Sequence, residues 1–381
     1  MTNPIPPSSG SPFGPPRTGA APAGGTQGQA LGGGAPPAAP GAPSAPSSFS
    51  APSQEQMNGR ALSPQEERTK DALMALRSEI GKAVVGQEGA VTGLIIALVA
   101  GGHALLEGVP GVAKTLLVRT MATALDVDMA RIQFTPDLMP ADITGSLVWD
   151  AGSSAFEFRR GPVFTNLLLA DEINRTPPKT QSALLEAMEE RQVSVDGQTH
   201  ALADPFMVIA TQNPVEYEGT YPLPEAQLDR FLLKLELPLP SRDAEFGIVK
   251  RHRDGFNPLA LADAGVRPVA SPADIAAARG AAARVDVSDT VLAYLVDVCR
   301  ATRESPSVRL GASPRGATAL LRTTRVWAFL QGRGFATPDD VKAMAAPTLA
   351  HRIGLRAEAD LEGLTAARVV EGVLAQVPVP R

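Results

Sequence analysis

The 381-residue chain has a single cysteine, Cys299, and only four histidines. One thiol excludes an internal disulfide, and four scattered histidines beside it leave no zinc-binding framework. The formal charge of -5 excludes a broadly basic coat for nucleic acid. The start of the chain lacks a basic segment followed by an apolar one, and the longest apolar run, 89–102, is too short to span a bilayer. We therefore expect a cytoplasmic protein without a membrane span.

The first 60 residues contain few apolar side chains larger than alanine. They hold 13 of the 35 prolines and 11 of the 35 glycines. Such a segment cannot bury enough apolar surface to offset its ordering entropy. We predict a disordered tail over 1–62 and interpret it as a solvated spacer. Order is expected from Ser63-Pro64-Gln65-Glu66, which combines a helix N-cap, a proline at the first helical position and a glutamate three residues after the cap.

Beyond the tail, short apolar segments alternate with amphipathic ones. Strands are predicted at 103–107, 129–134, 166–170, 206–211 and 231–237, with helices such as 114–125 and 179–191 between them. This alternation predicts a parallel sheet covered by helices on both faces. Two β-hairpins are predicted within it, at 147–158 and at 192–201, the second turning at Asp196-Gly197. After about Pro240 the pattern becomes helical, so a second, helical domain is expected.

A glycine-rich loop follows the first predicted strand and precedes a helix. The loop is Gly108-Val109-Pro110-Gly111-Val112-Ala113-Lys114-Thr115. In this context backbone N–H groups and the helix N-terminus bind phosphates, Lys114 reaches the β and γ oxygens, and the Thr115 hydroxyl contacts Mg²⁺. Ala113 stands where the usual pattern has its second glycine, and its methyl group narrows the allowed backbone angles. The alternative interpretation is a Gly/Pro turn that caps a helix.

Two acids, Asp171 and Glu172, end the apolar segment 167–170. Asp171 is suited to hold Mg²⁺ through water, and Glu172 to polarise an attacking water. The alternative is an acidic N-cap for the next helix. The phosphate-binding loop upstream favours the first interpretation, in which the two acids serve a metal-dependent nucleotidase.

Three further polar residues have two interpretations each. Asn213 after the fourth strand is placed to hold a water or a γ-phosphate, or it forms an Asn-Pro turn with Pro214. Arg230 suits the charge on a transferring phosphoryl group, or a surface ion pair with Asp229. Arg315 lies near the start of a helix, where the helix dipole disfavours a cation unless an anion binds there. The alternative for Arg315 is a solvated arginine.

The order of these residues resembles that of the AAA+ ATPases, and finer strings resemble the MoxR branch over about residues 65–375. The strings are GVPGVAKT at 108–115, GPVF at 161–164, ADEINR at 170–175, ATQNP at 210–214 and GTYPLPEAQLDRF at 219–231. The resemblance makes the alanine before Lys114 a feature of the family rather than a defect.

The resemblance also implies a role for each matching residue. Lys114 and Thr115 match Walker A, Asp171 and Glu172 Walker B, Asn213 sensor 1, Arg230 the arginine finger, Arg315 sensor 2, and Val85-Gly86-Gln87 the segment beside the adenine. The implied catalytic residues are Glu172, Lys114, Asn213, Arg230 and Arg315. The implied nucleotide-binding residues are Val85, Gly86, Gln87, Gly108, Val109, Pro110, Gly111, Val112, Ala113, Lys114, Thr115 and Asp171, with Thr115 and Asp171 as ligands of Mg²⁺.

The implied fold is a P-loop NTPase with a three-layer αβα core over 63–240, followed by a linker and a smaller all-α lid within 241–381. A helix-2 insert at about 137–160 and a pre-sensor-1 hairpin at about 192–202 are expected to face a central pore or a client protein. The implied assembly is a homo-oligomeric, hexameric ring. In it Arg230 acts on a neighbour's nucleotide and Arg315 reports the γ-phosphate to the lid.

The implied function is Mg²⁺-dependent ATP hydrolysis that drives chaperone-like remodelling or activation of a partner protein, one with a von Willebrand factor A domain. The alternatives are a metal-insertion motor like the ATPase of magnesium chelatase, a nucleic-acid motor, and a nucleotide-bound module without turnover. The acidic chain and its short basic clusters at 159–160 and 250–253 argue against nucleic acid. Glu172 beside Asp171 argues against a module without turnover.

Overall fold

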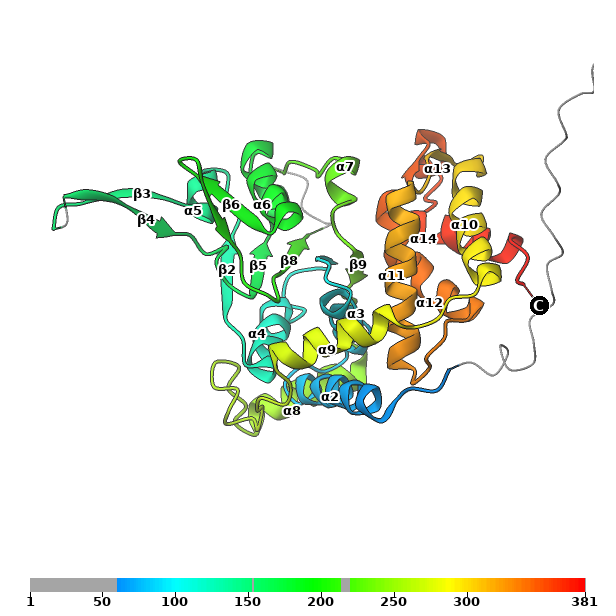
Figure 1. The fold of residues 1–381 in the computed structure, drawn as a ribbon, viewed down its shortest axis with the longest axis horizontal. Coiled ribbons are helices and arrows are strands. Elements are labelled where there is room, and N and C mark those ends of the chain that lie inside the picture. The colour runs from blue at the N-terminus through cyan, green and yellow to red at the C-terminus, as the bar shows by residue number, and fades with distance from the viewer. Residues whose placement is uncertain (1–59, 153, 214–219, 381) are drawn as a thin grey trace, which may run out of the picture. The chain divides into compact units, whose positions relative to one another are not determined.

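The computed structural model describes residues 60–152, 154–213 and 220–380 (Figure 1). The tail predicted over 1–62 therefore falls almost entirely outside the described residues, and so do Pro214 and Gly219. The described part begins at Arg60, whose guanidinium pairs with Glu66.

The first described helix, α2 (Pro64–Gly81), begins as the sequence predicts. The Ser63 hydroxyl accepts the Glu66 N–H at 3.3 Å, and the Glu66 carboxylate accepts the Ser63 N–H at 2.9 Å, so a complete capping box is formed. The Arg60 guanidinium is the main cause that lowers the pKa of Glu66 to about 2. This start fixes α2 where it packs against the following helix α3 (Glu88–Val99).

A five-stranded parallel sheet lies at the centre, with the strand order β2-β5-β8-β1-β9. The strands are β1 (Ala104–Glu107), β2 (Met129–Gln133), β5 (Leu167–Asp171), β8 (Met207–Gln212) and β9 (Leu233–Glu236). All five predicted strands are confirmed, each within two residues of its expected ends.

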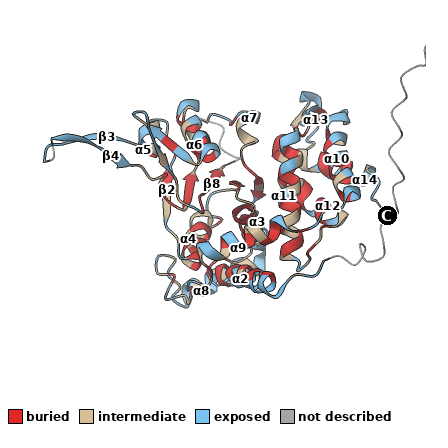
Figure 2. Ribbon diagram, in the orientation of Figure 1, coloured by how far each residue is buried: buried red, intermediate tan, exposed pale blue. Residues whose placement is uncertain are grey.

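The central strands of this sheet are almost entirely buried (Figure 2). Alternate residues of each strand belong to two hydrophobic clusters, one on each face. Leu106, Leu169 and Ile209 pack with α3 and α4 (Lys114–Leu125) on one face. Their strand neighbours pack with α5 (Pro140–Thr144) and α6 (Pro178–Glu190) on the other. Each fully buried leucine contributes about 1.5–3 kcal/mol through removal of apolar surface from water. The predicted three-layer αβα core is confirmed.

The strand order determines where polar loops meet. After β1 the chain crosses by α4 to the far edge strand β2, and it later returns to place β8 beside β1. The carboxyl ends of β5, β8 and β1 are therefore neighbours at a point where the chain reverses direction across the sheet. Ligands bind at such switch points in open α/β sheets.

Both predicted hairpins are present. Strands β3 (Gly145–Asp150) and β4 (Ala155–Arg160) form a ribbon that projects away from the sheet (Figure 1). Strands β6 (Gln192–Val195) and β7 (Gln198–Ala201) form the second hairpin. Its turn residues Asp196 and Gly197 have φ of 50° and 74°, as a tight primed turn requires.

The chain after the sheet is mainly helical. Its helices are α8 (Arg242–Arg253), α9 (Pro272–Ala283), α10 (Asp289–Glu304), α11 (Pro314–Leu330), α12 (Pro338–Leu349), α13 (Ala357–Leu361) and α14 (Ala366–Gln376). Helix α9 packs against α2 and α3. The all-α expectation misses one detail, because β10 (Val308–Leu310) and β11 (Gly354–Leu355) form a short antiparallel pair that ties the ends of α10 and α12 together. Within the described ranges, every helix is too short or too polar to cross a membrane.

Candidate functional site

The glycine-rich loop leads directly into α4 at the carboxyl end of β1. Ala113 is the N-cap of α4 and has φ 64° and ψ 26°, a left-handed conformation that costs an alanine about 1–2 kcal/mol. The start of α4 has no side-chain cap and no acid in its first turn, so the positive end of its dipole faces the loop. A Cβ built on Gly111 (φ 87°) would meet no atom within 4 Å, which leaves space in front of these N–H groups.

Two further contacts fix the loop, one through the Lys114 side chain and one through the backbone at Gly108. The Lys114 ammonium donates to the Gly108 carbonyl. A Cβ on Gly108 would lie 2.7 Å from the Leu237 carbonyl oxygen, so the loop passes the end of β9 only with glycine there. The arrangement fits the phosphate-binding loop better than a simple turn.

The two acids lie at the carboxyl end of β5, beside β8. The Thr211 hydroxyl donates to Asp171 Oδ1 at 2.6 Å and accepts the Glu172 N–H at 2.9 Å. Arg131 on β2 donates to Asp171 Oδ2 at 2.7 Å. The sequence analysis did not predict a role for Thr211 or Arg131. A threonine near the end of an apolar strand is a signal that could have indicated Thr211.

Glu172 is held in a sparsely populated conformation. Its φ of 56° turns it off the strand direction, at a cost of order 1–3 kcal/mol. Gln133 donates to its carboxylate at 2.8 Å, and Arg175 pairs with it at 3.0 Å. The acidic N-cap interpretation is not what the structure shows, since Glu172 makes no side-chain cap of the short helix that follows.

Asn213 follows β8 and is 5% exposed. Because β8 is paired with both β1 and β5, the backbone at Asn213 lies at the same edge as the loop and the acids. The alternative, an Asn-Pro turn, includes Pro214, which lies outside the described residues.

A cavity of about 170 Å³ adjoins the loop. It is lined by Ala83, Val84, Val85, Gln87, Gly111, Val112, Ala113, Leu116, Pro240, Ile248, Arg251, His252 and Phe256. It thus brings the segment matched to the adenine side together with the loop, and Gln87 is held there by its 3.0 Å hydrogen bond to the Pro238 carbonyl. The contribution of α8 was missed, because its apolar residues are few within a basic helix.

The oxygen donors at this edge suit a magnesium nucleotide. Among the described residues, no three histidine, cysteine, aspartate or glutamate side chains are grouped to hold a metal. Mg²⁺ bound with a nucleotide needs only one or two protein carboxylates besides phosphates and waters. The Thr115 hydroxyl and the Asp171 carboxylate therefore fit as its protein contacts.

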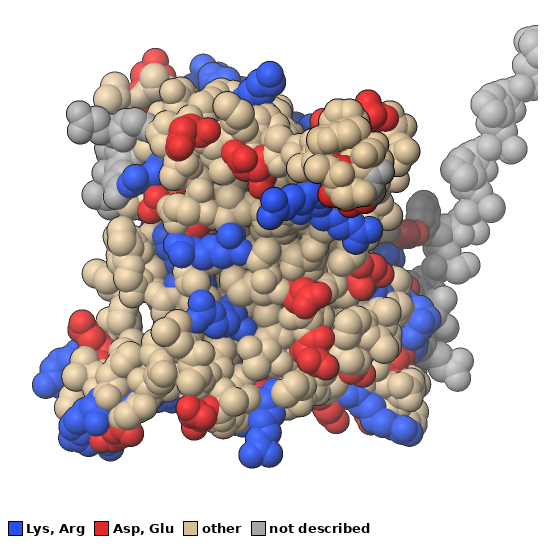
Figure 3. Space-filling model, turned by 90° about the vertical axis from the view of Figure 1, so that its left-hand side faces the viewer, with Lys and Arg blue, Asp and Glu red and all other residues tan. Residues whose placement is uncertain are grey.

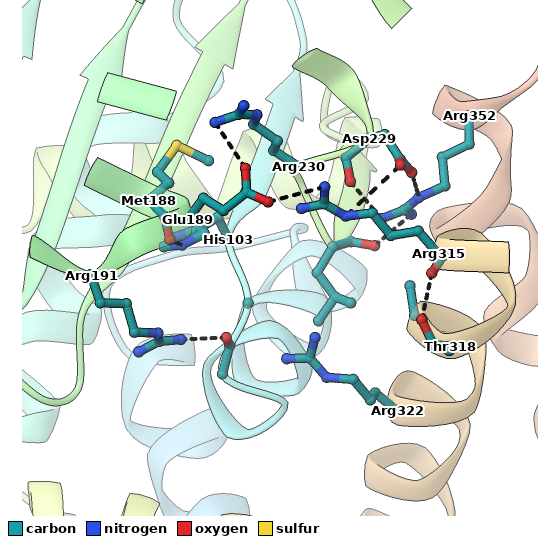
Figure 4. Close-up of a pocket in the computed structure, with 14 residues that line it drawn as sticks. His103, Met188, Glu189, Arg191, Asp229, Arg230, Arg315, Thr318, Arg322 and Arg352 are labelled. Carbon is teal, nitrogen blue, oxygen red and sulfur yellow. Dashed lines mark hydrogen bonds and ion pairs between the residues drawn. The ribbon is translucent and has the colours of Figure 1, made fainter. Parts of the chain in front are cut away.

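The two remaining predicted residues lie at the opposite edge of the sheet. Arg230 precedes β9, and Arg315 is the second residue of α11. Both line a cavity of about 280 Å³ together with 101–103, the residues before β1. Both pair with the Glu189 carboxylate, at 3.1 Å and 3.4 Å (Figure 4). The alternative interpretation of Arg230 placed its ion pair on Asp229, whereas in the described residues its ion pair is with Glu189.

The two edges are separated by the length of the strands. β1 and β9 are parallel, with Ala104 opposite Leu233 and Glu107 opposite Glu236. Three rises of about 3.3 Å place the two end residues of β1 about 10 Å apart, and the loops that carry the two sets of residues extend beyond these ends. Lys114 and the acids stand beyond one end, and Arg230 and Arg315 beyond the other. One bound triphosphate cannot contact both sets within a single chain.

Arg352 fastens the segment that carries Arg230 to the helical part of the chain. Its buried guanidinium pairs with Asp229 at 2.6 Å and donates to the carbonyls of Phe231 at 2.8 Å and Leu232 at 3.2 Å. Burial lowers the pKa of Arg352, and the Asp229 carboxylate opposes that shift. Asp229 also lies 3.8 Å from Arg315.

Further arginines converge on the end of α3. Arg191 donates to the Gly101 carbonyl at 2.6 Å, Arg279 to the Leu98 carbonyl at 3.5 Å, and Arg322 to the Ala100 carbonyl. Burial, together with repulsion among these cations, lowers the pKa of Arg191 and of Arg322. The cavity is lined by the arginines 191, 230, 315, 322 and 352 but only two carboxylates, those of Glu189 and Asp229. It is therefore suited to an anion.

Buried His103 completes the wall of this cavity. Its Nδ1 accepts the Val208 N–H at 2.9 Å, so its Nε2 donates to the Met188 carbonyl at 3.0 Å. Burial lowers the pKa of His103 to about 4. The imidazole is thus neutral at pH 7 and serves the packing of β1 against β8 and α6.

Comparison with known proteins identifies relatives over most of the chain. Residues 103–233 match the ATPase family associated with various cellular activities (AAA), and residues 300–373 match the AAA lid domain. The protein YeaC of Bacillus subtilis is 47% identical over 79% of this chain and 92% of its own length. The chaperone MoxR1 of Mycobacterium tuberculosis is 41% identical over 80% of this chain and 81% of its own length. The protein MoxR of Methylorubrum extorquens is 33% identical over 82% of this chain and 96% of its own length.

A solved structure shows the same fold. The crystal structure of a proposed ATPase from Cytophaga hutchinsonii superimposes with a TM-score of 0.77 at 40% sequence identity. The match covers 83% of this chain and 97% of that one.

Proposed function

The chain belongs to the MoxR family of AAA ATPases, and from this premise we propose that it hydrolyses ATP at junctions between its own copies. The observation that carries the proposal is the distribution of polar groups over the sheet. The groups that suit nucleotide binding and water activation lie at the carboxyl ends of the strands, here called the carboxyl edge. The arginines that suit the charge of a transferring phosphoryl group lie at the amino ends of the strands, here called the amino edge. A complete site then needs two subunits.

Within one subunit the carboxyl edge binds the nucleotide. The cavity beside Val85 and Gln87 receives the base, and the N–H groups of the loop and the Lys114 ammonium receive the phosphates. Glu172, aimed by Gln133 and Arg175, polarises the attacking water, with Asn213 beside it. When bound through Thr115 and Asp171, Mg²⁺ supplies positive charge at the phosphates.

The neighbouring subunit contributes Arg230 and Arg315 from its amino edge. Arginine fingers elsewhere accelerate phosphoryl transfer by about 10³–10⁵-fold, because a guanidinium stabilises the charge of the transition state. Head-to-tail contacts of this kind, when they close, produce a ring. The family resemblance makes six subunits the expected number, which mass measurement of the ATP-bound protein will test.

Two variants separate the edges. In Lys114→Ala we expect loss of ATP binding and of turnover. In Arg230→Ala we expect ATP binding to persist while phosphate release falls by about 10³-fold or more. Equilibrium binding of a fluorescent ATP analogue and a phosphate-release assay measure the two properties.

Mixing variants tests the junction itself. An equimolar mixture of Arg230→Ala with Glu172→Gln should regain turnover, since one partner supplies an intact carboxyl edge and the other an intact amino edge. The turnover of each variant alone, at the same total protein concentration, provides the baseline. Turnover that stays at this baseline would exclude a shared site.

We further propose that ATP turnover drives chaperone-like remodelling of a protein client, with von Willebrand factor A domain proteins as the candidate class. The β3–β4 ribbon supports a contact with protein, because Trp149 and Phe156 are 54% and 66% exposed and pack edge to face at 5.2 Å. The face in Figure 3 carries lysines and arginines across its middle, with acids above and below. This face therefore lacks the uniformly basic surface that nucleic-acid binding requires.

A trapped complex tests the client. Glu172→Gln, held with ATP, should retain a client protein in a pull-down, and adding Trp149→Ala should release it. Recovery of the same proteins with and without Trp149 would exclude the ribbon as the contact.

A further inference from the structure

Glu189 stands between the two arginines at the amino edge. Its Oε2 lies 3.1 Å from Arg230 Nη1, and its Oε1 lies 3.4 Å from Arg315 Nη1, so each carboxylate oxygen serves one guanidinium (Figure 4). The three side chains come from α6, from the segment before β9 and from α11. Two guanidiniums this close would otherwise repel each other, and the carboxylate removes that repulsion.

Each member of this cluster is also tied to the scaffold. Arg230 donates to the Leu185 carbonyl at 2.7 Å. Arg315 lies beside Asp229, which Arg352 holds from the interior. Glu189 itself is in the last turn of α6, a helix anchored in the core by buried residues such as Leu185.

The cluster remains open to a second molecule. The side chains of Glu189, Arg230 and Arg315 are 39%, 31% and 48% exposed. Arg230 and Glu189 also line a second, smaller cavity of about 210 Å³, so they form a ridge between two hollows. At this exposure an ion pair contributes only about 0–1 kcal/mol to folding, so the cluster is not explained by stability.

We propose that Glu189 is a positioning residue, which spaces Arg230 and Arg315 so that both reach the phosphates bound by the neighbouring subunit. This inference rests on the shared site proposed above. A group misplaced by about 1 Å can cost about 10²-fold in rate even where binding is unchanged. Glu189 thus acts on the rate through two arginines of its own chain, without a contact to the nucleotide of that chain.

Substitution by glutamine tests the role, since Glu189→Gln keeps the volume and removes the charge. We expect kcat to fall by about tenfold while KM for ATP stays constant, because the nucleotide of the same chain binds at the other edge. Glu304→Gln, the same substitution at the exposed end of α10 and outside both cavities, is the control and should retain the wild-type rate. A Glu189→Gln enzyme with the kcat of this control, or with a changed KM instead, would overturn the proposal.

Mixing excludes a merely structural effect. Glu189→Gln combined with Glu172→Gln should recover turnover, since the second variant carries an intact amino edge to the intact nucleotide site of the first. If the mixture with Arg230→Ala recovers and this one does not, Glu189 has no positioning role. If neither recovers, the shared site itself is wrong.

Discussion

At the carboxyl ends of the strands, left-handed backbone and the Thr211 hydroxyl position the polar groups, with Arg131, Gln133 and Arg175 as added partners, whereas at the amino ends long charged side chains alone position them. At the first edge Thr211 fixes both acids, and left-handed residues set the direction of the loop and of Glu172. At the second, charges from α6, α11 and the segment before β9 must converge. Local backbone conformation therefore contributes to the first edge, whereas the second depends on tertiary packing and charge balance throughout.

The largest effect that sharpens this comparison concerns Glu172. Glu172→Gln removes the proposed general base, and we expect phosphate release to fall by about 10²–10⁴-fold. ATP binding should persist, since the loop and the base cavity are untouched. A phosphate-release assay beside a nucleotide-binding titration separates the two, and unchanged release would remove Glu172 from the chemistry.

A smaller effect probes the amino edge through pH. Because burial lowers the pKa of His103 to about 4 from 6.5, the unfolded state takes up a proton first as the pH falls. His103 therefore contributes stability that is present above pH 6.5 and is lost as the pH falls toward 4. We expect the protonation of His103 in the unfolded state to lower the unfolding free energy by about 2 kcal/mol as the pH falls from 7 to 5.

Chemical denaturation of His103→Gln at the two pH values isolates this contribution from that of the other buried histidine, His351. The difference in unfolding free energy between wild type and variant should shrink by about 2 kcal/mol at pH 5. A difference independent of pH would contradict the prediction.

The smallest effect tests the strained backbone of the carboxyl edge. Ala113→Gly relieves a left-handed alanine, and it should raise the unfolding free energy by up to about 1 kcal/mol without loss of ATP turnover. Ala122→Gly, in the right-handed interior of the same helix, should lower it by about 1 kcal/mol. Denaturant titrations give both unfolding free energies. If both substitutions lower the unfolding free energy, the backbone at Ala113 is not strained.

This contrast also explains what the sequence could reveal. The strands, the Asp-Gly hairpin, the Ser63 cap and the acids after β5 are local patterns, and they could be predicted because neighbouring residues determine them. The family strings then added expected roles for Lys114, Asn213, Arg230 and Arg315, which stay predictions.

The amino edge was less accessible to prediction. Glu189 and Arg352 carry no local signal, since a charged residue near a helix end is usually solvated. That Arg230 and Arg315 share one carboxylate depends on how α6 and α11 approach each other, which no spacing in the chain records. Likewise Arg131 reaches Asp171 only because β2 and β5 are neighbours in the sheet.

Glu189 and the β6–β7 hairpin are separated by only two residues. Arg191, which lies between them, is pinned to the Gly101 carbonyl at 2.6 Å. Arg191 therefore anchors a short stretch that connects Glu189, in the shared site proposed above, with the hairpin. If subunits meet at Glu189 as proposed, a displacement there would need only a few peptide bonds to reach the hairpin, without a relay through the core.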